Sequence, residues 1–302
     1  MLPQSERRPE STWITIFRLL RWNKPEGRLI LMIPALWGVF LAARGNPPPL
    51  LIGVIVLGSL ATSAAGCVVN DLWDRNIDPH VQRTRNRPLA ARALSVKVGV
   101  VVALFAFACA WGLSLYLNPL TFWLCVAAVP VIVLYPLAKR VFPVPQLVLA
   151  IAWGFAVLIS WSAVSCTATA GATPCLGNAT WLLWGATILW TMGFDTVYAM
   201  PDRADDKQLG VNSSALFFGQ YAAHAVTVFF LGTAVLLAEV GQVMGLGIAY
   251  WLTLIGAIVT WSWQSLQLYR RNLPGTVYGQ IFRQNVWIGF LLLGGMILGC
   301  RL

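Results

Sequence analysis

Nine apolar stretches, each about 20 residues long, restrict the fold of this chain more than any other feature of its sequence. They are centred near residues 36, 60, 107, 128, 154, 189, 227, 252 and 290. A helix of roughly this length crosses the hydrocarbon core of a bilayer. A composition with 58% hydrophobic and 11% charged residues is also unlike that of a soluble domain. The sequence therefore predicts an all-α polytopic membrane protein with nine transmembrane helices.

Turn-forming residues separate these stretches, for example in RGNPPP at 44 to 49 and FPVPQ at 142 to 146. We find no linker long enough to divide the chain, so we expect one membrane domain at residues 28–302. Residues 1–27 carry acids among their arginines and lack an apolar segment that ends in a cleavage site, unlike a secretory signal or a transit peptide. We therefore expect a cytoplasmic N-terminal tail there.

The net charge of +10 reflects membrane topology rather than nucleic-acid binding. If the N-terminus lies inside, 19 of the 21 lysines and arginines fall on the inner side, and only Arg44 and Arg301 fall outside. The positive-inside rule predicts this asymmetry. The sequence has no basic stripe interleaved with aromatic residues, the pattern typical of a nucleic-acid-binding surface. We therefore expect a lipid bilayer as a partner, and no nucleic acid.

All seven aspartates fall in two clusters. In the first cluster, Asp71, Asp74 and Asp78 are spaced three and then four apart, so a continuing helix would place them on one face. The first cluster follows the second predicted helix and the other follows the sixth, so both open on the same side of the membrane and can face one another. Solvated helix-end charges are the ordinary alternative, although ionisable groups at membrane depth are usually functional. The second cluster consists of Asp195, Asp202, Asp205 and Asp206.

A diphosphate bridged by Mg²⁺ would fit two facing acidic clusters that also contain arginine and lysine. Mg²⁺ is usually bound by one or two carboxylates together with substrate phosphates, and the basic side chains would take the remaining phosphate oxygens. An allylic diphosphate ionises to a stabilised carbocation, so its transfer depends on neutralising the leaving group. His80 and His224 are isolated and do not indicate a nucleophilic mechanism. A transporter is the alternative from another class, but its site is expected near the bilayer midplane.

The acidic motifs resemble those of a known family. NDLWDRNIDPHVQRTRNRP at 70 to 88 resembles the first signature of the UbiA family of intramembrane prenyltransferases. DTVYAMPDRADDKQLG at 195 to 210 is similar to the second signature, as it appears in the 4-hydroxybenzoate polyprenyltransferase branch. RWNKPEGRLILMIPALW at 21 to 37 and LYPLAKRVFPVPQ at 134 to 146 resemble that branch's first helix and its loop between helices four and five. The resemblance covers nearly the whole chain.

The resemblance implies nine helices around a central cavity, two Asp-rich loops on the cytoplasmic side, a Mg²⁺ cofactor, a polyprenyl diphosphate donor and an aromatic acceptor. The residues implied to bind the Mg²⁺-diphosphate are Asn70, Asp71, Asp74, Asp78, Asp202 and Asp206. Asp195 and Tyr198 would lie deeper, near the reacting carbon or the acceptor, and would act in catalysis together with Asp71 and Asp74. The basic residues implied to contact substrate are Arg21, Lys24, Arg75, Arg85, Arg87, Lys139, Arg140, Arg203 and Lys207, each of which is also explained as an inner-side anchor.

The implied reaction is an electrophilic aromatic substitution on 4-hydroxybenzoate. The product, 3-polyprenyl-4-hydroxybenzoate, is an early intermediate of ubiquinone or plastoquinone. Homogentisate, dihydroxynaphthoate, haem and chlorophyllide are alternative acceptors, because the family shares its diphosphate motifs. We assign Arg140 to the acceptor carboxylate and Lys139 to phosphate, because a guanidinium can grip a carboxylate with two hydrogen bonds. We expect a bacterial inner membrane and an active site that faces the cytoplasm.

Two of the six cysteines differ in their setting from the others. Cys166 and Cys175 lie in the longest predicted outer loop and could form a disulfide if that face of the membrane is oxidising. The remaining four lie in or beside apolar helices, where we expect packed thiols.

Overall fold

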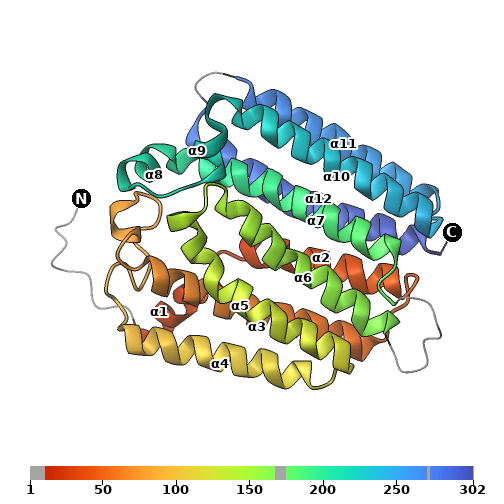
Figure 1. Ribbon diagram of the computed structural model, residues 1–302, viewed down its shortest axis with the longest axis horizontal. Helices are drawn as coiled ribbons and strands as arrows, with labels where there is room; N and C mark the ends of the chain where they lie inside the picture. The colour runs from red at the N-terminus through yellow and green to blue at the C-terminus, as the bar shows by residue number, and fades with distance from the viewer. Residues whose placement is uncertain (1–10, 167–174, 271–272, 302) are drawn as a thin grey trace.

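The computed structural model describes residues 11–166, 175–270 and 273–301 (Figure 1). Each of the nine predicted apolar stretches lies in a helix, the shortest of 17 and the longest of 26 residues. These long helices are α2 (Glu26–Ala42), α3 (Pro49–Asp74), α4 (Val96–Ser114), α5 (Pro119–Val141), α6 (Pro145–Ser165), α7 (Asn178–Ala199), α10 (Ala222–Met244), α11 (Ile248–Leu268) and α12 (Gly275–Gly299).

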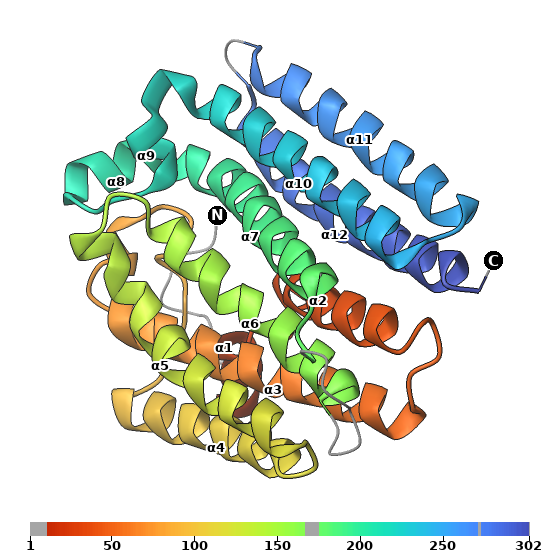
Figure 2. The same cartoon turned by 45° about the vertical axis from the view of Figure 1, so that its right-hand side comes forward.

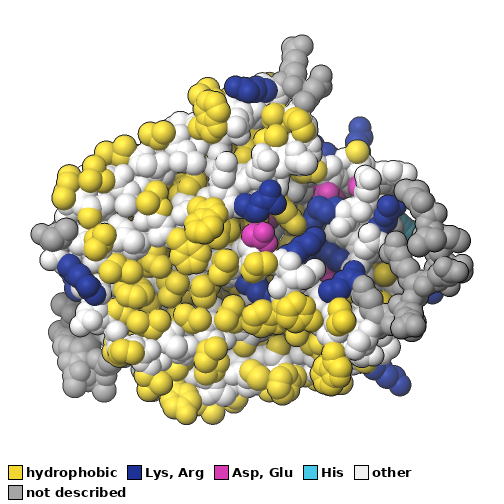
Figure 3. All heavy atoms as spheres, turned by 180° about the vertical axis from the view of Figure 1, so that it is seen from behind, with side chains coloured by type: hydrophobic (Ala, Val, Ile, Leu, Met, Phe, Trp, Pro, Cys, Tyr) yellow, Lys and Arg dark blue, Asp and Glu magenta, His cyan; other side chains and the backbone are white. Residues whose placement is uncertain are grey.

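Six helical segments in the described part of the chain are long and apolar enough to cross a membrane. They are α3, α4, α5, α6, α12 and the segment Ser214–Met244, which contains α10. Large apolar side chains such as Leu104, Leu231 and Leu291 are exposed on these helices, and Figure 3 shows hydrophobic side chains over much of one face. Such a surface fits contact with lipid, and the chain is an integral membrane protein.

Short helices join the long ones at one end of the bundle (Figures 1 and 2). In both views α8 lies at the same end as the loop around η2, although the two are far apart in the sequence. This end carries both aspartate clusters. The short elements are α1 (Thr12–Leu19), η2 (Asp78–His80), η3 (Met200–Asp202), α8 (Arg203–Leu209), α9 (Ser214–Phe218) and η4 (Gly219–Tyr221).

Several helix ends are set by capping residues in the sequence. Asn118 Oδ1 accepts a hydrogen bond from the Thr121 N–H at 2.9 Å, which caps the start of α5. Ser95 Oγ accepts one from the Val98 N–H at 3.3 Å at the start of α4. Gly245 ends α10 in the left-handed conformation, with a φ of +63°. These local signals divide the apolar sequence into separate helices.

Helices α2, α6 and α7 lie in the middle of the bundle (Figure 2). Helix α2 packs against α6 and α12, and α7 packs against α6 and α10. Trp37 of α2 stacks on Trp190 of α7 with ring centroids 4.9 Å apart, and its indole N–H donates to the Gly289 carbonyl at 2.9 Å. A Cβ atom at Gly289 would lie 2.7 Å from Ile33 Cδ1. Glycine therefore permits the close approach of α2 and α12.

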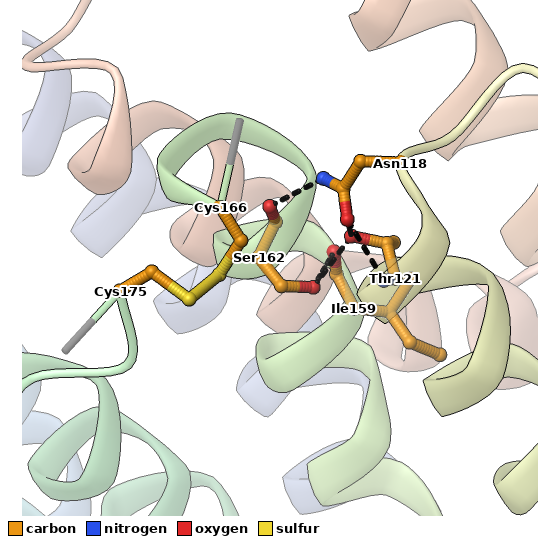
Figure 4. Close-up of a disulfide and its surroundings, with 6 residues drawn as sticks. All are labelled: Asn118, Thr121, Ile159, Ser162, Cys166 and Cys175. Atoms are coloured by element: carbon orange, nitrogen blue, oxygen red, sulfur yellow. Dashed lines mark hydrogen bonds between the residues drawn. A yellow bond between two sulfur atoms is a disulfide. The ribbon is translucent and has the colours of Figure 1, made fainter. Parts of the chain in front are cut away.

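The end of the bundle away from the aspartates carries a disulfide between Cys166 and Cys175 (Figure 4). Beside it, the Ser162 carbonyl accepts a hydrogen bond from Asn118 Nδ2 at 2.8 Å. The Ser162 and Thr121 hydroxyl oxygens lie 2.8 Å apart. These bonds join the end of α6 to the start of α5, so covalent and polar contacts fix this end of the bundle together.

Candidate functional site

A polar cavity of about 290 Å³ lies at the end of the bundle that carries the aspartates. Its walls come from α3, the loop around η2, α5, α6, α7, and the segment from η3 to the start of α9. The sequence predicted that the two aspartate clusters can face one another, and both line this cavity. The predicted site residues that line it are Arg21, Asn70, Asp74, Asp78, Arg87, Lys139, Asp195, Tyr198, Asp202 and Asp206.

The first aspartate cluster lies where α3 ends. Asp71 and Asp74 are in its last turn, Asp78 is in η2, and all three are at most 4% exposed. Arg87 Nη1 lies 2.8 Å from Asp78 and 3.2 Å from Asp71. Arg21 also donates to Asp71, at 2.7 Å; burial lowers the pKa of this arginine, but the charge of Asp71 and the hydrogen bond to it, together with Cys67 and Tyr198, raise the pKa overall. Because buried carboxylates require partners, these arginines stabilise the end of α3.

Arg83 lies in the loop that follows the first cluster, and its side chain bonds to residues of the second cluster's segment. Its Nε donates to Asp202 Oδ2 at 2.9 Å and its Nη1 to the Tyr198 hydroxyl at 2.9 Å. The guanidinium carbon also lies over the Tyr198 ring, 4.6 Å from its centroid. On the neighbouring α8, burial raises the pKa of Asp206 to about 6, so this carboxyl is mostly ionised at neutral pH. The second cluster therefore presents the Asp206 carboxylate to the cavity mostly in charged form.

The wall formed by α5 and α6 is fixed by hydrogen bonds to the segment that follows α8. Lys139, in the last turn of α5, places its Nζ 2.6 Å from Asp74 Oδ2. The Lys139 carbonyl accepts a hydrogen bond from the Asn212 N–H at 2.7 Å. Gln146 Oε1, at the start of α6, accepts one from the Ser214 N–H at 2.7 Å. The position of Lys139 is thus set by both its backbone and its side chain.

The oxygen atoms of this cavity suit Mg²⁺ held together with phosphate. Among the residues that the structure describes, no group of three or more His, Cys, Asp or Glu side chains converges closely enough to hold a metal ion. Asp74 Oδ1, however, is buried and makes no hydrogen bond with any described residue, so it has lone pairs free for a cation. Because Mg²⁺ usually takes one or two carboxylates and completes its shell with phosphate oxygens, the residues fit that ion.

Several predicted residues lie outside the cavity. Asp71 pairs with its arginines behind the lining. Arg140 donates to the Trp73 carbonyl at 2.7 Å, and Arg203 donates to the Ala215 carbonyl at 2.8 Å. These two arginines bind backbone carbonyls near helix ends, and their positions give no support to a role in substrate binding. The basic candidates that do not line the cavity are Lys24, Arg75, Arg85, Arg140, Arg203 and Lys207.

The sequence motifs did not identify Arg83 or Gln146. Arg83, Arg85 and Arg87 alternate along one loop, and their spacing does not reveal which side chains turn inward. The structure places Arg83 and Arg87 in the cavity wall and leaves Arg85 exposed. Gln146 offered a clearer signal, because an amide at the start of an otherwise apolar helix needs a buried partner.

An apolar cavity of about 710 Å³ adjoins the polar one. The two cavities share Cys67, Tyr135 and Leu149 in their linings. The apolar cavity extends among α3, α4, α5 and α6, and Gly27 and Leu31 of α2 also line it. A polar cavity with cations and carboxylates, continued by a larger apolar one, fits a ligand with an anionic head and a long hydrocarbon tail.

Comparisons with known proteins agree with this arrangement. The model of the UbiA prenyltransferase family matches residues 31–295. A protein of Synechocystis sp., described as 4-hydroxybenzoate solanesyltransferase, is 66% identical over 95% of this chain and 96% of its own length. A 4-hydroxybenzoate octaprenyltransferase of Ralstonia nicotianae is 38% identical over 94% of each chain.

Solved structures have the same fold. A UbiA homolog from Aeropyrum pernix superposes with a TM-score of 0.79 at 23% identity, over 89% of this chain and 97% of that one. A UbiA homolog from Archaeoglobus fulgidus, bound to GPP and Mg²⁺, superposes with a TM-score of 0.69 at 20% identity, over 93% of this chain and 99% of that one.

Proposed function

Because this chain belongs to the UbiA prenyltransferase family, we propose that it transfers a polyprenyl group from polyprenyl diphosphate to carbon 3 of 4-hydroxybenzoate. The observation that carries the proposal is the junction of two cavities: one holds both aspartate clusters, and the other is apolar and large enough for part of a prenyl chain. The names of the relatives from Synechocystis and Ralstonia support 4-hydroxybenzoate as the acceptor. The product is an early intermediate of ubiquinone or plastoquinone.

The diphosphate is held by the polar cavity. We assign Mg²⁺ to the oxygen atoms of Asn70, Asp74, Asp78, Asp202 and Asp206. When bound, Mg²⁺ neutralises charge on the leaving diphosphate. Arg83, Arg87 and Lys139 line the same cavity and supply N–H donors for the remaining phosphate oxygens. The UbiA homolog from Archaeoglobus fulgidus, solved with GPP and Mg²⁺ and with DMAPP and Mg²⁺, supports this assignment.

The reaction proceeds by loss of diphosphate and attack by the phenol ring. The allylic carbon–oxygen bond breaks, and its electron pair leaves with the diphosphate. The ring carbon ortho to the phenol oxygen then bonds to the allylic carbon, and the proton on that ring carbon is lost. Asp195 and Tyr198 lie in the cavity wall on α7, beside Cys67 and Tyr135 of the junction, where we place the acceptor ring. Asp195 is the residue we assign to holding the phenol or receiving the proton.

The prenyl tail occupies the apolar cavity. Trp111, Phe107 and Trp153 line that cavity together with aliphatic side chains, so the tail leaves water when it binds. Aromatic ring faces near the junction can also stabilise an allylic cation.

We place the polar cavity on the cytoplasmic side of a bacterial inner membrane, with all nine long helices crossing it. The distribution of basic residues supports this orientation. Helices α2, α7 and α11 pack within the same bundle as the six apolar segments, which supports counting them as crossings. The disulfide between Cys166 and Cys175 then lies on the opposite, oxidising side.

The experiment that tests this function offers the purified protein several acceptors. Protein in detergent or liposomes receives Mg²⁺, one long-chain prenyl diphosphate, and either 4-hydroxybenzoate, homogentisate, dihydroxynaphthoate, haem or chlorophyllide. Mass spectrometry should find prenyl transfer to 4-hydroxybenzoate. Transfer only to another acceptor would overturn the choice of acceptor, and transfer to none would favour a transporter.

A further inference from the structure

Arg28 is a buried arginine without a hydrogen-bonding partner. It lies in the first turn of α2 and is 3% exposed. In the described part of the chain, none of its three guanidinium nitrogens reaches an acceptor. Its guanidinium carbon lies over the Trp22 ring, 4.1 Å from the centroid. Burying an unpaired charge is costly, and a stacked ring leaves all the N–H donors of the guanidinium unsatisfied.

Arg28 itself lines neither cavity, but two residues close to it in α2 line the apolar one. Gly27 and Leu31, which flank it on the same side of α2, line the apolar cavity. Arg21, which lines the polar cavity, is close enough for its charge to act on Arg28. Side-chain torsions exchange between staggered rotamers. Binding of a ligand in the cavity by Arg28 therefore requires a change of rotamer that turns the guanidinium from Trp22 toward the cavity wall.

The cations that line the polar cavity already have acidic partners. Lys139 pairs with Asp74, and Arg87 pairs with Asp78. Arg21 and Arg83 are paired in the same way with Asp71 and Asp202. Arg140, the residue that the sequence suggested for the acceptor carboxylate, binds the Trp73 carbonyl outside the cavity. A second anion that enters beside the diphosphate therefore finds an unpaired cation in Arg28.

We propose that Arg28 binds the carboxylate of the aromatic acceptor and thereby selects a hydroxybenzoate over neutral phenols. The inference rests on the proposed function, because it assigns a partner to the carboxylate of that same acceptor. A planar guanidinium takes a carboxylate through two parallel hydrogen bonds. The negative charge of the carboxylate neutralises the charge of Arg28, and the bonds from Arg28 compensate for the hydration that the carboxylate loses. The acceptor phenol then points away from α2, toward the cavity junction.

The test compares two acceptors of nearly the same shape, 4-hydroxybenzoate and its neutral amide, 4-hydroxybenzamide. Steady-state kinetics are measured for wild type, Arg28→Met, Arg28→Lys and, as a control that removes an exposed charge elsewhere, Lys97→Met. In Arg28→Met, the KM for 4-hydroxybenzoate should rise at least about tenfold, because a buried charged pair is lost. The KM for prenyl diphosphate and the kcat/KM for the amide should change little. Arg28→Lys should recover part of the loss, and Lys97→Met should match wild type.

The outcomes separate this inference from the proposed function. If wild type prenylates 4-hydroxybenzoate but Arg28→Met leaves its KM unchanged, or weakens acid and amide equally, the inference is wrong and the function stands. If wild type does not prenylate 4-hydroxybenzoate, both are wrong.

A second measurement tests a purely structural role. Replacing an unpaired buried charge with an apolar side chain of similar length is neutral or stabilising, so Arg28→Met should unfold in detergent at the wild-type temperature or above. Added 4-hydroxybenzoate should raise the unfolding temperature of wild type only. A large fall for Arg28→Met, together with an unchanged acceptor KM for Arg28→Lys, would identify Arg28 as a packing residue and overturn the inference.

Discussion

Lys139 Nζ lies 2.6 Å from one carboxylate oxygen of Asp74, while the other oxygen of Asp74 is buried without a hydrogen bond. Arg83 and Asp202 form a similar pair on the opposite wall of the cavity. Cations of the cavity are thus paired with its carboxylates. Under the proposed function, a Mg²⁺-diphosphate would exchange these partners, because the carboxylates would bind the metal and the cations would bind the phosphates.

This exchange predicts that Mg²⁺ and diphosphate bind synergistically. Mg²⁺ alone must compete with lysine and arginine for the carboxylates, and diphosphate alone must compete with the carboxylates for the cations. Calorimetric titration of the purified protein should give weak binding of Mg²⁺ and of inorganic pyrophosphate separately, and much tighter binding of either in the presence of the other. Equal affinities with and without the second ligand would contradict the exchange.

The variant Lys139→Met tests the binding of Mg²⁺ and the binding of phosphate separately. It removes the cation that competes for Asp74, so the affinity for Mg²⁺ alone should rise severalfold. It also removes a phosphate donor, so the affinity for pyrophosphate with Mg²⁺ should fall by about tenfold or more. Lys97→Met, which removes an exposed lysine away from the cavity, should change neither constant.

The two acidic walls predict a strict requirement for the metal. Asp74→Ala and Asp202→Ala should each abolish prenyl transfer, because each removes a carboxylate from a different side of the cavity. EDTA should do the same to the wild type, and added Mg²⁺ should restore activity. Asp205→Ala is the matched control: Asp205 accepts a hydrogen bond from the Gln82 N–H at 3.3 Å but does not line the cavity, and we expect at most a severalfold loss. Full wild-type activity in excess EDTA would overturn the assignment of the metal.

The proposed orientation can be tested by labelling cysteines with an impermeant maleimide. Single cysteines at Gln82 and Lys207, in a background without the native free cysteines, should react only from the cytoplasmic side. Both residues are exposed, and the segments that carry them are in contact.

Cys166 should react only from the opposite side and only after reduction, since it is held in a disulfide. The other position suggested by the sequence, Thr173, lies outside the described residues. Labelling of Gln82 and Lys207 from different sides would refute the shared cavity.

The positions of the long helices and the meeting of the two aspartate clusters were predictable from the sequence. The first depends on the length of the apolar stretches, and the second depends on helical spacing and on the number of helices between the clusters. Apolar length determines where a helix can lie in a bilayer, and helical spacing brings acids such as Asp71 and Asp74 to one turn. The partners of the basic side chains were not predictable. Nothing in the sequence indicated, for example, that Arg140 donates to the Trp73 carbonyl. The direction of a long side chain depends on tertiary packing, and the neighbouring residues in the sequence do not determine that packing.

The membrane core contains a polar network that should contribute measurably to stability. Asn285 Oδ1 accepts hydrogen bonds from the indole N–H groups of Trp190 at 2.8 Å and Trp261 at 3.0 Å. Its Nδ2 donates to Gln264 Oε1 at 3.1 Å, and Asn285 itself is fully buried. Leucine has a similar volume but neither accepts nor donates. Asn285→Leu therefore leaves two indole donors and one amide acceptor unsatisfied in an apolar interior.

Each unsatisfied buried group costs about 1–3 kcal/mol, although polar contacts inside membrane proteins often measure nearer 1 kcal/mol. We expect Asn285→Leu to destabilise the detergent-solubilised protein by about 2–4 kcal/mol. The matched control is Thr260→Val, since the Gly256 carbonyl of its own helix is the only hydrogen-bonding partner of the Thr260 hydroxyl among the described residues; it should cost less than about 1 kcal/mol. Reversible unfolding monitored by tryptophan fluorescence measures both, and Asn285→Leu should also shift the emission because two indoles lose their acceptor. If both variants unfold at the wild-type midpoint, the network fills space without stabilising the fold.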